Sequence, residues 1–168
     1  MSAGKIQYAE SDGSFILKFV GDVRLTLCST LDKMLESILK QPGIKSVIID
    51  LTETGGIDST SLGLLARLSI QSQKCFGIVP TIVSTNEDIN RILVTMGFDK
   101  VFFIVTAASD DSVEMLKDVP CEDGSEQDVM DKVLEAHKTL MNLNEHNRQE
   151  FQNLVDRLER DRKAGKAL

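Results

Sequence analysis

The sequence predicts an α/β fold, in which a mixed β-sheet packs with helices and a helical extension follows at the C-terminus. Three observations predict this fold. Short β-branched runs alternate with amphipathic helical segments from residue 27 to residue 105, an order that implies parallel strands. Asp12-Gly13 joins the first two runs, and this dipeptide is typical of an antiparallel hairpin. Beyond residue 128, apolar residues recur at helical spacing.

The predicted elements follow from runs of apolar residues and from the breaks between them. Pro42-Gly43 ends the first helix, and Gly97 ends the third. Pro80 lies near the start of its strand, where a missing N–H is tolerated. In chain order, we predict strands at 5–11 and 15–20, a helix at 27–39, a strand at 47–51, a helix behind residues 58–61, a strand at 78–83, a helix at 86–96 and a strand at 101–105.

The segment 47–68, VIIDLTETGGIDSTSLGLLARL, is the centre of the prediction. Residues 47–51 are expected to form a strand buried on both faces, and residues 52–57 a turn in which Gly55-Gly56 supplies backbone freedom. Residues 58–61, Asp-Ser-Thr-Ser, are small and polar, and their simplest role is to cap the next helix. A second role stays open, because unpaired N–H groups and the helix dipole at such a place attract a negative group.

A sequence motif favours this second role, the binding of a negative group at the start of the helix. Ile48-Ile49-Asp50-Leu51 is followed by Asp58-Ser59-Thr60-Ser61-Leu62-Gly63, and the pair resembles the phosphorylation loop of bacterial anti-sigma-factor antagonists, or anti-anti-sigma factors, of the STAS-domain family. The resemblance covers about residues 5–105. It implies the STAS fold, a mixed β-sheet with helices packed on one side. It also implies that Ser59 is the residue that is phosphorylated.

The resemblance implies a regulatory protein that is not an enzyme and needs no cofactor. In such a partner switch, the unphosphorylated antagonist binds an anti-sigma factor and frees the sigma factor for transcription. A serine kinase, which brings the ATP, inactivates the antagonist through Ser59, and a PP2C-type phosphatase restores it. Ser61 stands where the family has Gly, and Arg24 stands where it has an acid. The residues expected to contact partners are Asp22, Arg24, Asp58, Thr60 and Ser61.

Charge and composition narrow the class of protein. The formal net charge is −7, and residues 106–128 supply almost all of it, with one basic and eight acidic side chains. No stretch forms a basic surface for nucleic acid. No apolar run is long enough to span a bilayer, so no membrane contact is expected. The three cysteines are odd in number and widely spaced, which indicates reduced thiols in a cytoplasmic protein without a metal site.

Three regions are predicted: a STAS domain at 1–105, an acidic linker at 106–128 and a C-terminal amphipathic helical extension at 129–168. The helix pattern runs from 127 to 163, with a plausible break at 144–147. The apolar stripe can fold back on the domain, pair with a second copy, or contact a regulatory partner. This extension is similar to that of the antagonist type in the HptB-dependent secretion and biofilm pathway. That similarity implies a response-regulator phosphatase and a flagellar-type anti-sigma factor as partners.

Two other classes of function stay open. A STAS module can be the soluble docking subunit of a membrane transporter. A small enzyme can use a serine such as Ser59 as its nucleophile, but residues 1–105 contain no histidine that would serve as its base. The two histidines, His137 and His146, lie nine residues apart in the extension, not at the i, i+4 spacing of a helical metal pair. Both are expected to be solvated side chains.

Overall fold

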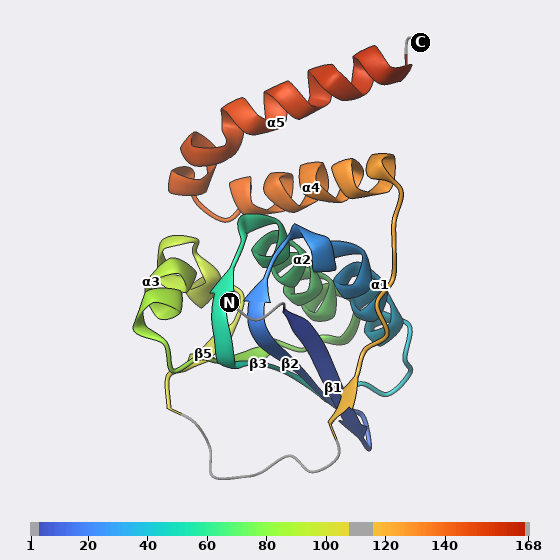
Figure 1. Cartoon of the computed structure of the whole chain (residues 1–168). Helices are drawn as coiled ribbons and strands as arrows, with labels where there is room; N and C mark the ends of the chain where they lie inside the picture. The colour runs from blue at the N-terminus through green and yellow to red at the C-terminus, as the bar shows by residue number, and fades with distance from the viewer. Residues whose placement is uncertain (1–3, 108–115, 167–168) are drawn as a thin grey trace.

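Figure 1 presents the computed structural model of the chain, which describes residues 4–107 and 116–166. Two short 3-10 turns, Leu25–Leu27 and Phe98–Lys100, accompany the helices. In chain order the elements are β1 (Lys5–Ser11), β2 (Ser14–Val23), α1 (Cys28–Leu39), β3 (Ser46–Ile57), α2 (Ser59–Phe76), β4 (Thr81–Val83), α3 (Glu87–Thr95), β5 (Phe103–Val105), β6 (Lys117–Asp118), α4 (Glu126–Met141) and α5 (Glu145–Lys166).

The sheet is mixed, as predicted, with the strand order β5-β4-β3-β2-β1-β6. β1 pairs antiparallel with both β2 and β6, while the pairs β2–β3, β3–β4 and β4–β5 are parallel. Asp12 and Gly13 turn the hairpin with φ angles of 49° and 86°, the region that an Asp-Gly turn requires. β6 was not predicted. It lies in the expected linker, and two residues are too few to show a strand period.

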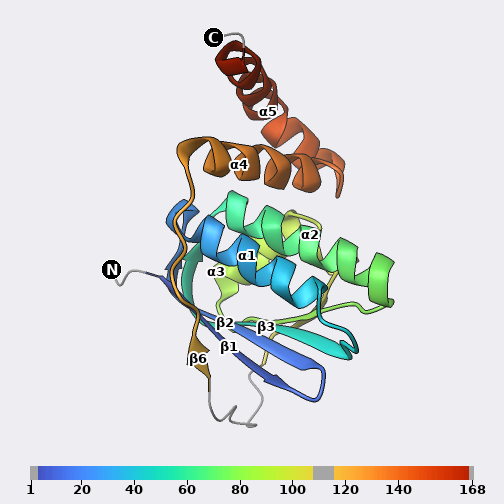
Figure 2. The same ribbon diagram turned by 90° about the vertical axis from the view of Figure 1, so that its right-hand side faces the viewer.

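Helices α1 and α2 cover one face of the sheet, with α3 beside them (Figure 2), which confirms the STAS arrangement. In β3, Val47, Ile49 and Leu51 are buried against these helices, while Ile48 and Asp50 between them are half-exposed. The expectation of a strand buried on both faces was therefore wrong. An alternating burial pattern is what a sheet covered on one face produces.

The predicted turn at residues 52–57 was also wrong, because β3 continues through Ile57 and pairs with the end of β2. Neither Gly55 nor Gly56 takes a positive φ. A Cβ on Gly56 would lie 2.7 Å from Asp22 Oδ1, so a larger residue there would displace the Asp22 carboxylate. The strand is thus extended by pairing with β2, a contact that its own polar, glycine-rich sequence does not announce.

The C-terminal extension folds back on the domain. It forms two helices, with a break at residues 142–144 close to the predicted position. Figures 1 and 2 show α4 lying across α1 and α2 on the side away from the sheet, with α5 on top of α4. Leu134, Ala136 and Leu140 of α4 are buried. Residues 108–115 of the predicted linker lie outside the described residues, so the division of the chain at residues 105 and 128 stays a prediction.

The pairing of β2 with β3 shifts register at Phe19, since Lys18 pairs with Asp50 but Val20 with Glu53. The buried Thr54 hydroxyl donates a 2.7 Å hydrogen bond to the Phe19 carbonyl in this irregular region. A register shift of this kind bends a strand. Here it shapes the end of β3 that leads directly to Asp58 and α2.

Thr54→Val keeps the side-chain shape and removes this donor. We expect the free energy of unfolding, measured by urea titration, to fall by about 1–3 kcal/mol, because a buried carbonyl loses its partner. Thr52→Val is the matched control, since the Thr52 hydroxyl bonds only to the half-exposed Asp50 two residues away. Equal losses in the two variants would contradict this role for Thr54.

Candidate functional site at the start of helix α2

The segment that the motif singled out is a well-built helix start. Asp58 is the N-cap of α2, and its carboxylate accepts a 2.9 Å hydrogen bond from the Ser61 backbone N–H. The Asp58 N–H donates to the Val23 carbonyl at 3.0 Å, which fixes the cap to the end of β2. Ser59 is the first residue of the helix and is half-buried. The capping role of Asp58 is therefore confirmed.

The Ser59 hydroxyl contacts a histidine from the C-terminal extension. Ser59 Oγ lies 2.8 Å from His137 Nε2, and His137 Nδ1 lies 2.7 Å from the Val133 carbonyl oxygen. A carbonyl only accepts, so Nδ1 carries the proton of the neutral ring. Nε2 is then the acceptor, and the Ser59 hydroxyl donates to it. The ring is thus fixed in one tautomer with its free nitrogen on Ser59.

The expectation of a solvated His137 was wrong. Its side chain is only 2% exposed, and the Phe151 ring of α5 packs against it edge-on, with 4.9 Å between centroids. Burial lowers the pKa of His137 below its usual 6.5, against the opposing effects of the Val133 carbonyl and the Asp58 charge. A signal for this burial was present in the sequence. His137 lies four residues after Val133 and three before Leu140, on the same apolar face. His146 is exposed, as expected.

α4 approaches the first turns of α2 very closely. A Cβ on Gly63 would lie 2.3 Å from the Ala136 carbonyl oxygen and 2.7 Å from the Ala136 Cβ. Only a glycine opposite a small residue permits this approach. Gly63 belongs to the recognised motif, but its contact with the extension was not foreseen. This contact sets the distance between α4 and α2, at which the next residue, His137, reaches Ser59.

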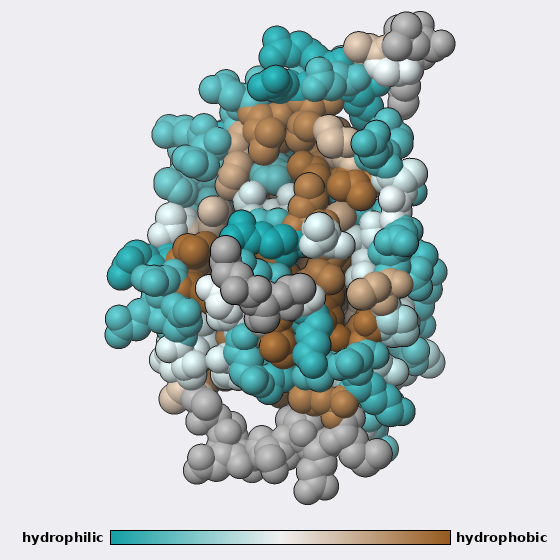
Figure 3. Space-filling view, in the orientation of Figure 1, coloured by the Kyte–Doolittle hydropathy of each residue, from teal (hydrophilic) through white to brown (hydrophobic). Residues whose placement is uncertain are grey.

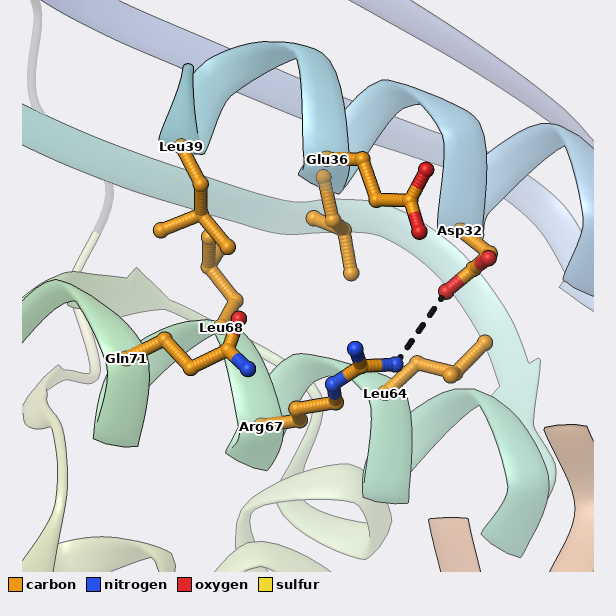
Figure 4. Close-up of a pocket in the computed structure, with 8 residues that line it drawn as sticks. Asp32, Glu36, Leu39, Leu64, Arg67, Leu68 and Gln71 are labelled. Carbon is orange, nitrogen blue, oxygen red and sulfur yellow. Dashed lines mark ion pairs between the residues drawn. The ribbon is translucent and has the colours of Figure 1, made fainter. Parts of the chain in front are cut away.

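An ion-pair cluster links α1, α2 and α4 beside the site. The mostly buried Asp32 lies 3.6 Å from Arg67 Nη1 (Figure 4) and 3.7 Å from Lys132 Nζ, and Arg67 also lies 3.4 Å from Glu135. Burial raises the pKa of Asp32, while Lys132 opposes that shift. The cavity between α1 and α2 next to this cluster holds about 10 Å³. That volume admits at most a single water, so it is no site for a small molecule.

The other residues expected to contact partners are divided by the fold. Asp22 and Arg24 lie at the end of β2 and pair with each other at 3.6 Å, with Arg24 exposed and Asp22 half-buried. They share the sheet edge with Asp58. Thr60 and Ser61 are buried, Ser61 completely, and the Ser61 hydroxyl has no hydrogen-bond partner. Their roles as partner contacts stay predictions.

Within residues 4–107 and 116–166, no group of three or more histidine, cysteine, aspartate and glutamate side chains is arranged to hold a metal ion. Over the same described residues, no helix combines the length and the apolarity that crossing a membrane requires. The candidate site is therefore the serine hydroxyl at the start of α2 and the buried imidazole bonded to it.

The lowered pKa of His137 predicts a pH effect on stability. The unfolded chain takes up this proton more readily than the native chain. The free energy of unfolding should therefore fall as pH drops below 6.5, until the native His137 is itself protonated. Urea titrations between pH 7.5 and 5 (roughly one unit either side of an ordinary histidine pKa) measure the effect. His137→Gln should flatten this pH dependence, and His146→Gln, which removes the exposed histidine, should leave it unchanged. Identical profiles for all three proteins would refute the buried neutral ring.

The chain is similar to a known domain family and to several solved structures. The family model for the STAS domain matches residues 5–112, well over half of the chain. Among solved structures, the anti-sigma factor antagonist SpoIIAA in its unphosphorylated form shares 10% identity, with a TM-score of 0.54, over 62% of this chain and 89% of that one. An anti-sigma factor antagonist from Mycobacterium paratuberculosis shares 18%, with a TM-score of 0.55, over 64% and 90%. Bacillus SpoIIAA in its phosphorylated form shares 10%, with a TM-score of 0.51, over 62% and 92%. The chain belongs to the STAS domain family.

Proposed function

We propose that this chain is a cytoplasmic anti-sigma-factor antagonist that acts by partner switching. The unmodified protein binds an anti-sigma factor, and this binding releases the sigma factor. Phosphorylation of Ser59 causes the anti-sigma factor to dissociate. The observation that carries the proposal is the placement of Ser59 as the first residue of α2, behind its Asp58 cap, in a STAS domain. Solved structures of similar fold support it: two are of anti-sigma factor antagonists, SpoIIAA and the Mycobacterium paratuberculosis protein, and a third is of SpoIIAA in its phosphorylated form.

The proposed modification is a phosphoryl transfer from ATP that a partner kinase holds. A bond forms between Ser59 Oγ and the γ-phosphorus, the bond from that phosphorus to the β–γ bridging oxygen breaks, and ADP leaves. A base of the kinase accepts the hydroxyl proton. In the reverse direction, a PP2C-type phosphatase directs water at the phosphoserine phosphorus, which restores the hydroxyl and releases inorganic phosphate. The chain itself needs no cofactor for either step.

A phosphate on Ser59 changes the electrostatics of this surface, while α2 itself can keep its backbone conformation. It adds about −1.5 to −2 charge and three acceptor oxygens at pH 7. The N-terminus of α2 tolerates negative charge there, as the capping Asp58 carboxylate already illustrates. A partner docked over Ser59 instead meets a bulky dianion beside Asp58. Asp22 and Arg24 lie at the same sheet edge and are the polar contacts that we assign to the partner.

The partners that we propose are an anti-sigma factor, a serine kinase and a PP2C-type phosphatase. A single response-regulator protein that carries both kinase and phosphatase activities would satisfy the last two. A flagellar-type anti-sigma factor fits the similarity of the extension to the HptB-dependent secretion and biofilm type. We assign no nucleic-acid or membrane partner. The net charge of −7 disfavours a phosphate backbone as a ligand.

The test is the modification state of Ser59 and its effect on binding. Mass spectrometry of the protein purified from its own cells should find phosphate on Ser59. In pull-downs with the co-purified anti-sigma factor, Ser59→Ala should retain binding. Ser59→Asp should weaken it about tenfold or more, because a charge in the middle of an interface costs several kcal/mol when it is left unpaired. Isothermal titration with the purified pair gives the affinities.

Thr85→Asp is the matched control, because it adds the same charge at an exposed position just before α3. It should bind like the unmodified protein. Unmodified Ser59 in cells, with equal binding by the Ala and Asp variants, would reduce residues 58–61 to a helix cap. Recovery of a permease and its ATPase in place of an anti-sigma factor would favour the alternative of a transporter docking subunit.

The contact between Ser59 and His137 also has the geometry of a nucleophile and its base, so catalysis needs its own test. We propose that the pair is structural, because α4 covers the hydroxyl and a backbone carbonyl, not a carboxylate, orients the ring. A panel of activated esters should therefore show no hydrolysis that Ser59→Ala removes. Turnover by the unmodified protein that is lost in both Ser59→Ala and His137→Gln would establish an enzyme instead.

A further inference from the structure

The surface on which the proposed function depends is partly covered by the chain's own α4, which leaves Ser59 half-buried. His137 accepts the hydrogen bond of the Ser59 hydroxyl, and Ala136 lies against Gly63 one turn further along α2. Thr60 and Ser61 are buried in the same region. A kinase that needs the Ser59 hydroxyl, or a partner that docks on this helix start, meets α4 first.

The underside of α4 is only partly apolar. Ala136 and Leu140 belong to the hydrophobic core of the domain, and beside them three polar side chains reach the domain: Lys132 pairs with Asp32, the exposed Glu135 with Arg67, and His137 with Ser59. Water can replace each of these partners when α4 lifts, whereas no such exchange is available to an apolar core. The buried Ser61 hydroxyl lacks any hydrogen-bond partner in the closed arrangement, and exposure to water would supply one. Opening of α4 is therefore opposed mainly by the exposure of Ala136 and Leu140, since water can replace its polar partners.

α5 packs on the side of α4 that faces away from the sheet, and side-chain contacts join the two helices. Phe151 packs on the His137 ring, Lys138 lies 2.6 Å from Glu159, and Arg162 lies 3.4 Å from Asp131. Figure 3 shows apolar surface near the top of the molecule, where the two helices lie. Between them is an open cleft of about 150 Å³ lined in part by Met130, Leu134 and Leu158. α5 thus follows α4 when α4 moves.

The corner between the helices is anchored to the end of α3 by hydrogen bonds. Asn147 donates from its amide to the carbonyl oxygens of Met96 and Leu140 at 2.8 Å, and Asn144 donates to the Thr95 carbonyl oxygen at 3.2 Å. Two of these bonds reach the C-terminal end of α3, whose last carbonyls have no partner within their own helix. At the other end of α4, the connection to β6 is held by the Glu122 N–H, which donates to Thr30 Oγ1 at 2.9 Å.

With a neutral His137 ring, a phosphate on Ser59 destabilises this closed arrangement. The phosphate removes the hydroxyl group that donates a hydrogen bond to His137. It also places a dianion beside Asp58 and against an imidazole ring that is only 2% exposed. The contact of Gly63 with Ala136 prevents α4 from moving closer to α2, so that room for the phosphate requires α4 to move outward. We infer that α4 and α5 form a lid that closes over unmodified Ser59 and that phosphate on Ser59 holds open.

This inference rests on the proposed function, because it takes Ser59 as the modified residue. It adds a control that the small antagonist fold does not have by itself. In the closed state the lid competes with any partner for the helix start, so the apparent affinity of the partner falls by the fraction of molecules that are closed. The lid also limits the access of the kinase to Ser59.

Hydrogen–deuterium exchange measured by mass spectrometry on the full chain tests the lid. Phosphoserine is installed at position 59 by genetic encoding, so that the result depends on no kinase and no partner. Amides of α4 should exchange about tenfold faster or more in the phosphorylated protein, as expected when a cooperative unit opens locally. Those of β3 serve as the internal reference and should not change.

Gly63→Ala provides a second route to the open lid, since the added methyl meets the Ala136 carbonyl while alanine favours the α2 helix. It should accelerate exchange in α4 and leave β3 protected. Gly165→Ala is the matched control, because nothing lies within 4 Å of its added Cβ. Protection of α4 that is equal in the unmodified and phosphorylated chains would overturn the lid, even if cells do phosphorylate Ser59. Fast exchange in α4 of the unmodified protein would overturn it as well.

Discussion

The close approach of α4 to the first turns of α2 is the constraint on which the rest of this structure depends. Gly63 permits it, because any larger residue would meet the Ala136 carbonyl. The approach brings His137 onto Ser59, and burial lowers the pKa of that ring. The neutral ring then accepts a hydrogen bond from the serine hydroxyl. Sterics, solvation and hydrogen bonding at the site thus follow from one missing side chain.

The STAS scaffold positions the site in a way that the sequence largely predicts. The Asp12-Gly13 hairpin, the parallel order of the later strands and the Asp58 cap all arise from local patterns, and each was found where it was expected. The extent of β3 was not predictable, because its last residues are polar and glycine-rich and are extended only by pairing with β2. β6 consists of two residues held by β1, too few for any pattern to form.

The residues of the candidate site were likewise predictable only in part. Asp58 and Ser59 were identified from a contiguous motif, whereas His137 comes from a part of the chain that carries no motif. Its position on the apolar face of α4, between Val133 and Leu140, was the available signal. That face shows that a side chain is buried but not against what. The pairing of one surface with another distant in sequence depends on shape, and Gly63 opposite Ala136 is a match that neither segment contains alone.

The separation of Ser59 from His137, 78 residues along the chain, has a consequence during synthesis. Domains fold from the N-terminus as the chain leaves the ribosome, at roughly 5–20 residues per second. The sheet from β1 to β5 and its three helices are all encoded before α4. A newly made molecule therefore passes through an interval of a few seconds in which the serine has no imidazole above it. In that interval the nascent protein presents the uncovered form of its site, before the finished chain covers it.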